Sequence, residues 1–176
     1  MDAADLERFV RTIPDFPAPG ILFRDISPLI ADAAAFAATI KLLTGRVGAA
    51  GPDKIAGIEA RGFIFGAAVA VAANCGFVPV RKAGKLPVPA LSVDYALEYG
   101  QDRLELDPTM IVPGDRCVIV DDLLATGGTT LAAAQLLRAA GAEVTAAQFV
   151  IELTGLQGAT ALRAAGLEGS ALLAFT

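Results

Sequence analysis

Apolar and polar residues recur along this chain with two different periods, and these periods predict strands that alternate with helices. Short apolar runs predict buried strands at residues 55–58, 77–81, 117–121, 144–151 and 171–175. Apolar or alanine-rich stretches, with Phe36, Ile40 and Leu43 at helical spacing, predict helices at residues 2–11, 33–47, 62–73, 131–140 and 155–165. This alternation predicts an α/β fold with a doubly wound, mostly parallel sheet flanked by helices.

Two segments depart from this alternation. The proline-rich stretch that follows residue 11 and runs to Ser27 predicts irregular backbone, and we refer to residues 1–31 as the hood. Apolar and polar residues alternate at 91–97 and 103–106 on either side of a turn at 99–102, which predicts a hairpin that projects from the sheet within residues 86–108. Because no repeat or linker interrupts the pattern, residues 1–176 are expected to form one domain.

The segment 62–80 contains no charged residue and is as long as a membrane span. Asn74, Cys75 and Gly76 form a stop signal inside it, so the segment predicts a packed helix followed by a short strand. The first residues are acidic and do not resemble a signal peptide. We therefore expect a soluble, cytoplasmic protein that does not bind a membrane.

The charge balance argues against a nucleic-acid partner. The chain has fourteen Lys and Arg residues and nineteen Asp and Glu residues, which gives a formal net charge of −5. Nucleic-acid binding, by contrast, needs a broad basic surface. The 176 residues can bury roughly 70% of their unfolded surface. The cations of interest are local: Arg24, Arg61, Arg81, Lys82 and Lys85. Such local charge suits a small polyanionic ligand.

The histidine and cysteine content narrows the possible chemistry. The chain contains no histidine, which excludes a Ser/His triad and a histidine base. Cys75 and Cys117 lie in apolar surroundings and are expected to be buried free thiols in a reducing compartment. Catalysis would therefore rest on positioning and electrostatics.

The most informative segment is Val118-Ile-Val-Asp-Asp-Leu-Leu-Ala-Thr-Gly-Gly-Thr-Thr130. Its turn lies between a predicted strand and a predicted helix, so backbone N–H groups at a helix N-terminus are available to an anion. Gly127 and Gly128 allow close approach of the backbone, and the Thr126, Thr129 and Thr130 hydroxyls are further donors. The turn therefore predicts a site for one phosphate.

Asp121 and Asp122 precede that turn and would repel a phosphate, but carboxylates accept hydrogen bonds from vicinal hydroxyls. A ribose phosphate satisfies both halves of the motif. The alternative is a helix cap beside a solvated strand end, since Asp and Thr are ordinary capping residues. The chain contains no Gly-x-Gly and no Gly-Lys-Ser/Thr, which excludes the dinucleotide fingerprint and the P-loop.

Val118 to Thr130 resembles the signature of the type I phosphoribosyltransferases, which bind 5-phosphoribosyl 1-diphosphate. Four further blocks, at residues 16–28, 58–66, 80–87 and 97–100, resemble the adenine phosphoribosyltransferase family in order and spacing. The resemblance implies the type I fold with a small N-terminal hood and a flexible catalytic hairpin. It also implies transfer of the 5-phosphoribosyl group to adenine, which yields AMP and diphosphate in purine salvage.

The resemblance assigns roles to individual positions. Residues that bind the 5′-phosphate would be Ala125, Thr126, Gly127, Gly128 and Thr129. Residues that bind diphosphate would be Glu59, Ala60, Arg61, Arg81, Lys82 and Lys85. Leu22, Phe23 and Arg24 would contact adenine, through a stacked ring and backbone groups. Glu98, Tyr99, Arg61, Asp121 and Asp122 would be catalytic, with Glu98 assisting proton movement on the base.

The resemblance also implies partners. Mg²⁺ would be held mainly through the substrate, with Asp121 and Asp122 as the protein contacts within reach and no dedicated metal site. The loop at Glu59 and Ala60 would contain a strained or cis peptide. The counterpart of Arg81 reaches into a neighbouring subunit's site, which implies a homodimer.

Other interpretations of these residues stay open from the sequence. Arg61 could be a solvated residue at a helix start, Glu98 a solvated strand charge, and Arg24 could pair with Asp25. The function could instead be that of a sibling enzyme for a 6-oxopurine, or of a regulator that senses nucleotides without catalysis. The retained Lys85 and Glu98-Tyr99 blocks favour an enzyme.

Overall fold

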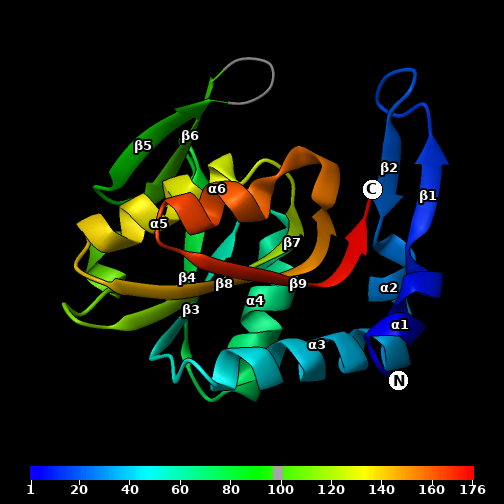
Figure 1. Cartoon of the computed structure of the whole chain (residues 1–176). Helices are drawn as coiled ribbons and strands as arrows, with labels where there is room; N and C mark the ends of the chain where they lie inside the picture. Colours follow the sequence, from blue (N-terminus) through cyan, green and yellow to red (C-terminus); the bar gives the residue numbers. More distant parts are fainter. Residues whose placement is uncertain (97–100) are drawn as a thin grey trace.

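The computed structural model describes residues 1–96 and 101–176, and its centre is one seven-stranded sheet (Figure 1). The strand order is β5-β6-β4-β3-β7-β8-β9. Neighbours among β4, β3, β7, β8 and β9 run parallel, whereas β6 pairs antiparallel with both β4 and β5. The predicted doubly wound, mostly parallel sheet is confirmed. Its strands are β3 Lys54–Ile58, β4 Gly76–Lys82, β5 Leu91–Ala96, β6 Gln101–Leu106, β7 Arg116–Leu124, β8 Glu143–Leu153 and β9 Glu168–Phe175.

Helices cover both faces of the sheet. α3 (Ala33–Gly48) and α4 (Arg61–Ala72) pack on one face, and α5 (Gly128–Ala139) and α6 (Gly158–Ala164) on the other (Figure 1). Strand β7 separates two cores: Ile119 belongs to the core under α5, whereas Val118 and Val120 belong to the core under α3 and α4. Successive side chains of a strand point to opposite faces, which explains why the central strands are continuously apolar.

The hood is more regular than the sequence predicted. The predicted helix 2–11 is wrong in its length: α1 covers Ala3–Leu6, a 3-10 turn covers Glu7–Phe9, and strand β1 then covers Arg11–Pro14. β1 pairs antiparallel with β2 (Leu22–Asp25), and α2 (Ser27–Ala31) follows. The segment before Ser27 is therefore a ribbon, which stands beside the end of β9 (Figure 1). Its two strands pair across a proline-containing loop, and the order of apolar and polar residues in either strand does not predict this pairing.

The hairpin is part of the main sheet, because β6 pairs with β4 through Arg81 with Glu105 and Lys82 with Leu104. Gln101 and Asp102, which were predicted to lie in the turn, begin strand β6 instead. Glu98 and Tyr99 lie outside the described residues.

Several element ends differ from the predicted ones. β7 continues through both aspartates to Leu124, and α5 begins at Gly128, three residues before the predicted start. The predicted helix 155–165 is a 3-10 turn at Thr154–Leu156 followed by α6, and β9 begins earlier than predicted.

Both cysteines are free, but only Cys117 is buried; Cys75 is partly exposed. Burial raises the pKa of the Cys117 thiol to about 11.

Candidate active site

A cavity of about 340 Å³ lies at the carboxyl ends of β3 and β7, where α4 and α5 begin. In parallel α/β sheets, ligands bind beyond the carboxyl ends of the strands. The structure brings together here most of the residues that the sequence singled out: Glu59, Ala60, Arg61, Lys82, Asp121, Asp122 and Ala125 to Thr129. Thr130, whose hydroxyl the sequence suggested as a donor, also lines the cavity, and the structure adds Ile58, Leu123 and Leu124, which neighbour the predicted residues in sequence.

Residues 125–129 form one wall of this cavity, and we call them the phosphate loop after the role predicted from the sequence. Gly127 precedes α5 with φ of 87°, a left-handed backbone conformation that residues other than glycine rarely adopt. Its carbonyl accepts the Leu131 N–H at 2.9 Å, and this bond closes the first turn of the helix. The earlier N–H groups of α5 have no partner inside the helix and lie at its positive end. The loop is therefore shaped to bind an anion.

Gly158, the first residue of α6, supports the phosphate loop from behind. A Cβ atom placed on Gly158 would lie 2.3 Å from the Ala125 carbonyl oxygen and 2.8 Å from Leu124 Cδ1. These distances are far below normal contact, so the backbone of α6 packs directly on the loop. The sequence contained no signal for this support, because Gly158 appeared only as a residue within a predicted helix.

Asp121 and Asp122 line the cavity next to the phosphate loop. Asp122 Oδ2 accepts a hydrogen bond from Arg61 Nε at 2.5 Å, and Asp121 Oδ1 accepts the Asp122 N–H at 2.8 Å. Burial and the neighbouring Asp122 charge raise the pKa of the Asp121 carboxyl well above its usual value. A Cβ on Gly62 would lie 2.7 Å from Asp121 Oδ1, so this glycine makes room for the carboxylate.

The loop between β3 and α4 contains a cis peptide bond between Glu59 and Ala60. Glu59 Oε2 accepts hydrogen bonds from the Lys82 N–H at 2.9 Å and from Arg81 Nε at 3.0 Å. Burial alone would raise the pKa of Glu59, but these two donors hold it below its usual value. Glu59 therefore stays ionised and ties the β3–α4 loop to β4.

The cations of β4 separate into two groups. Lys82 lines the cavity, whereas the Arg81 guanidinium lies on Glu59 and over the Phe63 ring, 5.8 Å from its centroid. Neither Arg81 nor the exposed Lys85 lines the cavity in this structure. Alternation along the strand accounts for the separation of Arg81 from Lys82.

A second cavity of about 520 Å³ lies between the hood and α4. Phe23 and Arg24 line it, as the sequence suggested, but the half-exposed Leu22 side chain does not. Its other lining residues are Ile13, Phe16, Asp25, Ile26, Ser27, Ile30, Arg61 and Ile64. Arg61 lines both cavities, so the two cavities adjoin at this side chain. The apolar walls suit a flat aromatic ring.

Arg24 does not pair with Asp25, which corrects one of the interpretations left open by the sequence. Its guanidinium donates to Thr12 Oγ1 at 2.6 Å and to the Thr176 carbonyl at 3.0 Å, and stacks on the Phe175 ring. Asp25 pairs with Arg11 instead, because these two residues are partners in the β1–β2 ribbon. Adjacent strand residues point to opposite faces, so Arg24 and Asp25 point apart.

Asp25 connects the ribbon to α2, and its loss should destabilise the hood. The carboxylate accepts hydrogen bonds from Arg11, the Ser27 N–H and the Ser27 hydroxyl. The Ser27 hydrogen bonds, with help from Arg11, lower its pKa from 3.8 to about 2. Since this pKa is depressed on folding, its contribution to stability is complete above pH 3.8 and disappears as the pH falls through about 2.

We expect Asp25→Asn to lower the free energy of unfolding by about 2 kcal/mol at pH 7, because charge-assisted hydrogen bonds are lost. Urea unfolding at pH 7, 4 and 2.5 measures this effect. The difference between the two proteins should shrink as the pH falls. A difference that is the same at all three pH values would contradict the role given to the ionised carboxylate.

Comparison with known proteins agrees with this geometry. A model of the phosphoribosyl transferase domain matches residues 25–160. The adenine phosphoribosyltransferase of Novosphingobium aromaticivorans is 62% identical over 175 residues, which cover 99% of this chain and 98% of that protein. The chain belongs to the adenine phosphoribosyltransferase family.

Solved structures of this adenine phosphoribosyltransferase family have the same fold. The enzyme from Thermoanaerobacter pseudethanolicus superposes with a TM-score of 0.94 at 46% identity, over 98% of this chain and 99% of that one. The Saccharomyces cerevisiae enzyme, solved with D-2,5-dideoxy-2,5-imino-altritol 1,6-bisphosphate and adenine, superposes with a TM-score of 0.92 at 38% identity, over 97% and 98% of the two chains. The high coverage shows that the match includes the hood.

Phosphoribosyltransferases generally use Mg²⁺, and the cavity has the oxygen donors that this hard cation prefers. The carboxylates of Asp121 and Asp122 line it beside the phosphate loop. Within residues 1–96 and 101–176, no three metal-binding side chains gather into a dedicated site. Two adjacent carboxylates fit a metal ion that takes its other ligands from the substrate. In the same residues, no helix has the length and apolar character needed to cross a membrane.

Proposed function

We propose that this chain transfers the 5-phosphoribosyl group from 5-phosphoribosyl 1-diphosphate to adenine, releasing AMP and diphosphate. The observation that carries the proposal is the position of Arg61, which lines both the cavity of the phosphate loop and the apolar hood cavity. A ribose phosphate in the first cavity would present its anomeric carbon toward a base in the second. The reaction belongs to purine salvage.

The ribose phosphate is held at both ends. The phosphate loop at the start of α5 would bind the 5′-phosphate through Ala125 to Thr129. Asp121 and Asp122 would accept hydrogen bonds from the 2′- and 3′-hydroxyls. These contacts fix the sugar, so that the anomeric carbon meets the base in a near-attack position. Positioning of this kind is the main contribution available to a site without a histidine.

Departure of diphosphate leaves positive charge on the ribose ring and carries negative charge away. Arg61 and Lys82, the cations that line the cavity, would stabilise the departing group, with Arg81 and Lys85 as further proposed ligands. Mg²⁺, when bound, would neutralise diphosphate charge, and Asp121 and Asp122 would be its protein contacts. The Asp122 carboxylate, which pairs with Arg61, would stabilise the oxocarbenium character of the transition state.

Adenine would lie between the apolar walls of the hood cavity. Phe23 packs edge-on against Phe16, with ring centroids 5.2 Å apart, and this contact holds the Phe23 ring in place. The side chain of Asp25 is fully engaged by Arg11 and Ser27 and is not free to read the base. Readout of the adenine amino edge would fall to backbone groups near Leu22 and Arg24. Glu98 and Tyr99 keep their predicted catalytic roles.

We also infer that the protein acts as a homodimer in the cytoplasm, as one domain that comprises the hood, the sheet and the hairpin. Arg81 does not line its own cavity, which suits a role in the site of a neighbouring subunit. Val71 on α4 is 83% exposed, and Ala72, the next residue, lines an apolar surface together with Phe36 and Ile40 of α3. Such a surface favours association. Sedimentation velocity tests it, since a monomer at micromolar concentration would contradict the inference.

The proposed reaction is tested by incubating the protein with Mg²⁺, 5-phosphoribosyl 1-diphosphate and one base at a time: adenine, hypoxanthine, guanine or xanthine. We expect AMP from adenine and no nucleotide from the other three bases. Product from a 6-oxopurine would preserve the role of the phosphate loop and contradict that of the hood. Saturable binding of the ribosyl donor without product from any base would indicate a sensor.

A further inference from the structure

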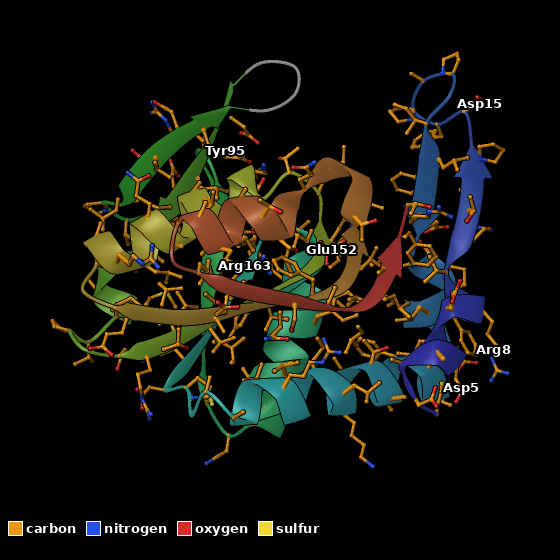
Figure 2. The ribbon with its side chains drawn as sticks, viewed as in Figure 1. Asp5, Arg8, Asp15, Tyr95, Glu152 and Arg163 are labelled. Carbon is orange, nitrogen blue, oxygen red and sulfur yellow. The ribbon has the colours of Figure 1, made fainter. Side chains whose placement is uncertain are left out.

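Lys82 is held over the active-site cavity by two residues of the hairpin. Its ammonium group donates to the Tyr95 hydroxyl at 2.7 Å and forms an ion pair with Asp102 Oδ2. The Tyr95 hydroxyl also donates to Asp102 Oδ2 at 3.1 Å, so the three side chains form a closed triangle. Tyr95 lies on β5 (Figure 2) directly opposite Asp102 on β6 in the strand register. Sheet pairing therefore fixes both partners of Lys82.

The two cations that line the cavity have different kinds of partner. Arg61 pairs with Asp122, which itself lines the cavity. Lys82 pairs with Asp102, which does not line it and belongs to a different part of the fold. Burial would lower the pKa of Lys82, but the hydrogen bonds with Asp102 and Tyr95 raise it. Lys82 thus stays charged with its charge balanced from the hairpin.

A polyanion that enters the cavity must compete with the Asp102 carboxylate for the Lys82 ammonium group. Diphosphate is attracted to the Lys82 ammonium and repelled by the Asp102 carboxylate, and both side chains are about one-third exposed. Interactions between partly exposed charges are modest, so an incoming anion can replace Asp102 as the partner of Lys82. Lys82 can turn from one anion to the other, since its long side chain has several rotatable bonds.

We propose that Asp102 is an exchangeable counter-ion for Lys82, which diphosphate replaces when it binds, and that Asp102 thereby sets the affinity of the site for diphosphate. This proposal rests on the proposed function, because it takes the cavity of Lys82 as the diphosphate site. Tyr95 is a positioning residue that keeps the ammonium group next to the cavity during the exchange. The residues given direct roles in the reaction do not include Asp102 or Tyr95.

Asp102→Asn tests the proposal, because asparagine keeps the shape and can still accept from Lys82 and Tyr95 while the competing charge is removed. Isothermal titration with pyrophosphate and Mg²⁺ should show binding about three- to fivefold tighter than in the original protein, the size expected for a partly exposed ion pair. The affinity for AMP, which contacts the phosphate loop and carries no diphosphate, should stay unchanged.

Asp94→Asn is the matched control. Asp94 lies on the same hairpin, and its carboxylate pairs with Arg103 at 2.6 Å without contacting Lys82. Its removal changes the net charge equally and should leave pyrophosphate binding unchanged. In a Lys82→Met background, the gain caused by Asp102→Asn should disappear, since the exchange requires the ammonium group.

Four results would overturn the proposal. They are unchanged or weaker pyrophosphate binding by Asp102→Asn, an equal gain in Asp94→Asn, persistence of the gain without Lys82, and an equal gain for AMP. Failure of the unmodified protein to bind pyrophosphate would overturn the proposed function and this inference together. AMP formation from adenine with no effect of Asp102→Asn would overturn this inference alone.

Discussion

Replacing Asp121 and Asp122 together by asparagine should lower kcat/KM for the ribosyl donor by about a thousandfold. Each carboxylate is proposed to accept a ribose hydroxyl, and a hydrogen bond to a charged acceptor contributes roughly 2 kcal/mol. Two such losses correspond to about 4 kcal/mol, or three decades of rate. Steady-state rates of AMP formation, measured at several donor concentrations, give the value.

The fold should survive this double replacement. Asparagine has the same shape, and an amide oxygen at position 122 can still accept from Arg61. Burial already disfavours the charged form of Asp121, as its raised pKa indicates, so a neutral residue there removes a cost. This gain at position 121 offsets the weaker hydrogen bond between Arg61 and the amide at position 122, so the melting temperature should change little. Asp94→Asn combined with Asp107→Asn removes two carboxylates that do not line the cavity and serves as the control. Activity like that of the unmodified protein would contradict the proposed contacts with the ribose hydroxyls.

Gly158→Ala should lower kcat/KM for the ribosyl donor by about a hundredfold, although Gly158 lies outside the cavity lining. The added Cβ would meet the Ala125 carbonyl oxygen at 2.3 Å, and a backbone atom cannot rotate away as a side chain can. The phosphate loop must shift, and a displacement of about 1 Å at a site of positioning can cost two decades of rate. The loss should appear mainly in KM for the donor and in the affinity for AMP.

Gly155→Ala is the matched control for this replacement, because a Cβ there would have no atom within 4 Å. Both variants carry the same chemical change, and they lie on either side of the Gln157 turn before α6. The KM for adenine should stay nearly constant in both, since the hood cavity does not include Gly158. An equal rise in both KM values for Gly158→Ala would indicate general damage to the fold, and unchanged donor kinetics would show that the loop is not supported there.

Local sequence determined the parts of this protein whose residues are neighbours along the chain. The alternation of strands and helices could be predicted because each element carries its own apolar period. The position of the two aspartates beside the loop 125–129 could be predicted because strand end, turn and helix start follow one another from Val118 to Thr130. In the hood, where a proline-containing loop separates the two strands, local signals failed, and the β1–β2 ribbon was missed.

Tertiary structure alone decided which residues from distant segments meet. Gly158 lies behind Ala125, Asp102 pairs with Lys82, and Arg11 rather than Arg24 pairs with Asp25. None of these contacts has a local period, because each depends on strand register or on helix packing between segments far apart in the chain. The position of Arg61 between two cavities likewise depends on how α4 lies relative to the hood. One short segment can contain the residues that line a site, but the contacts that hold those residues in position come from distant segments of the fold.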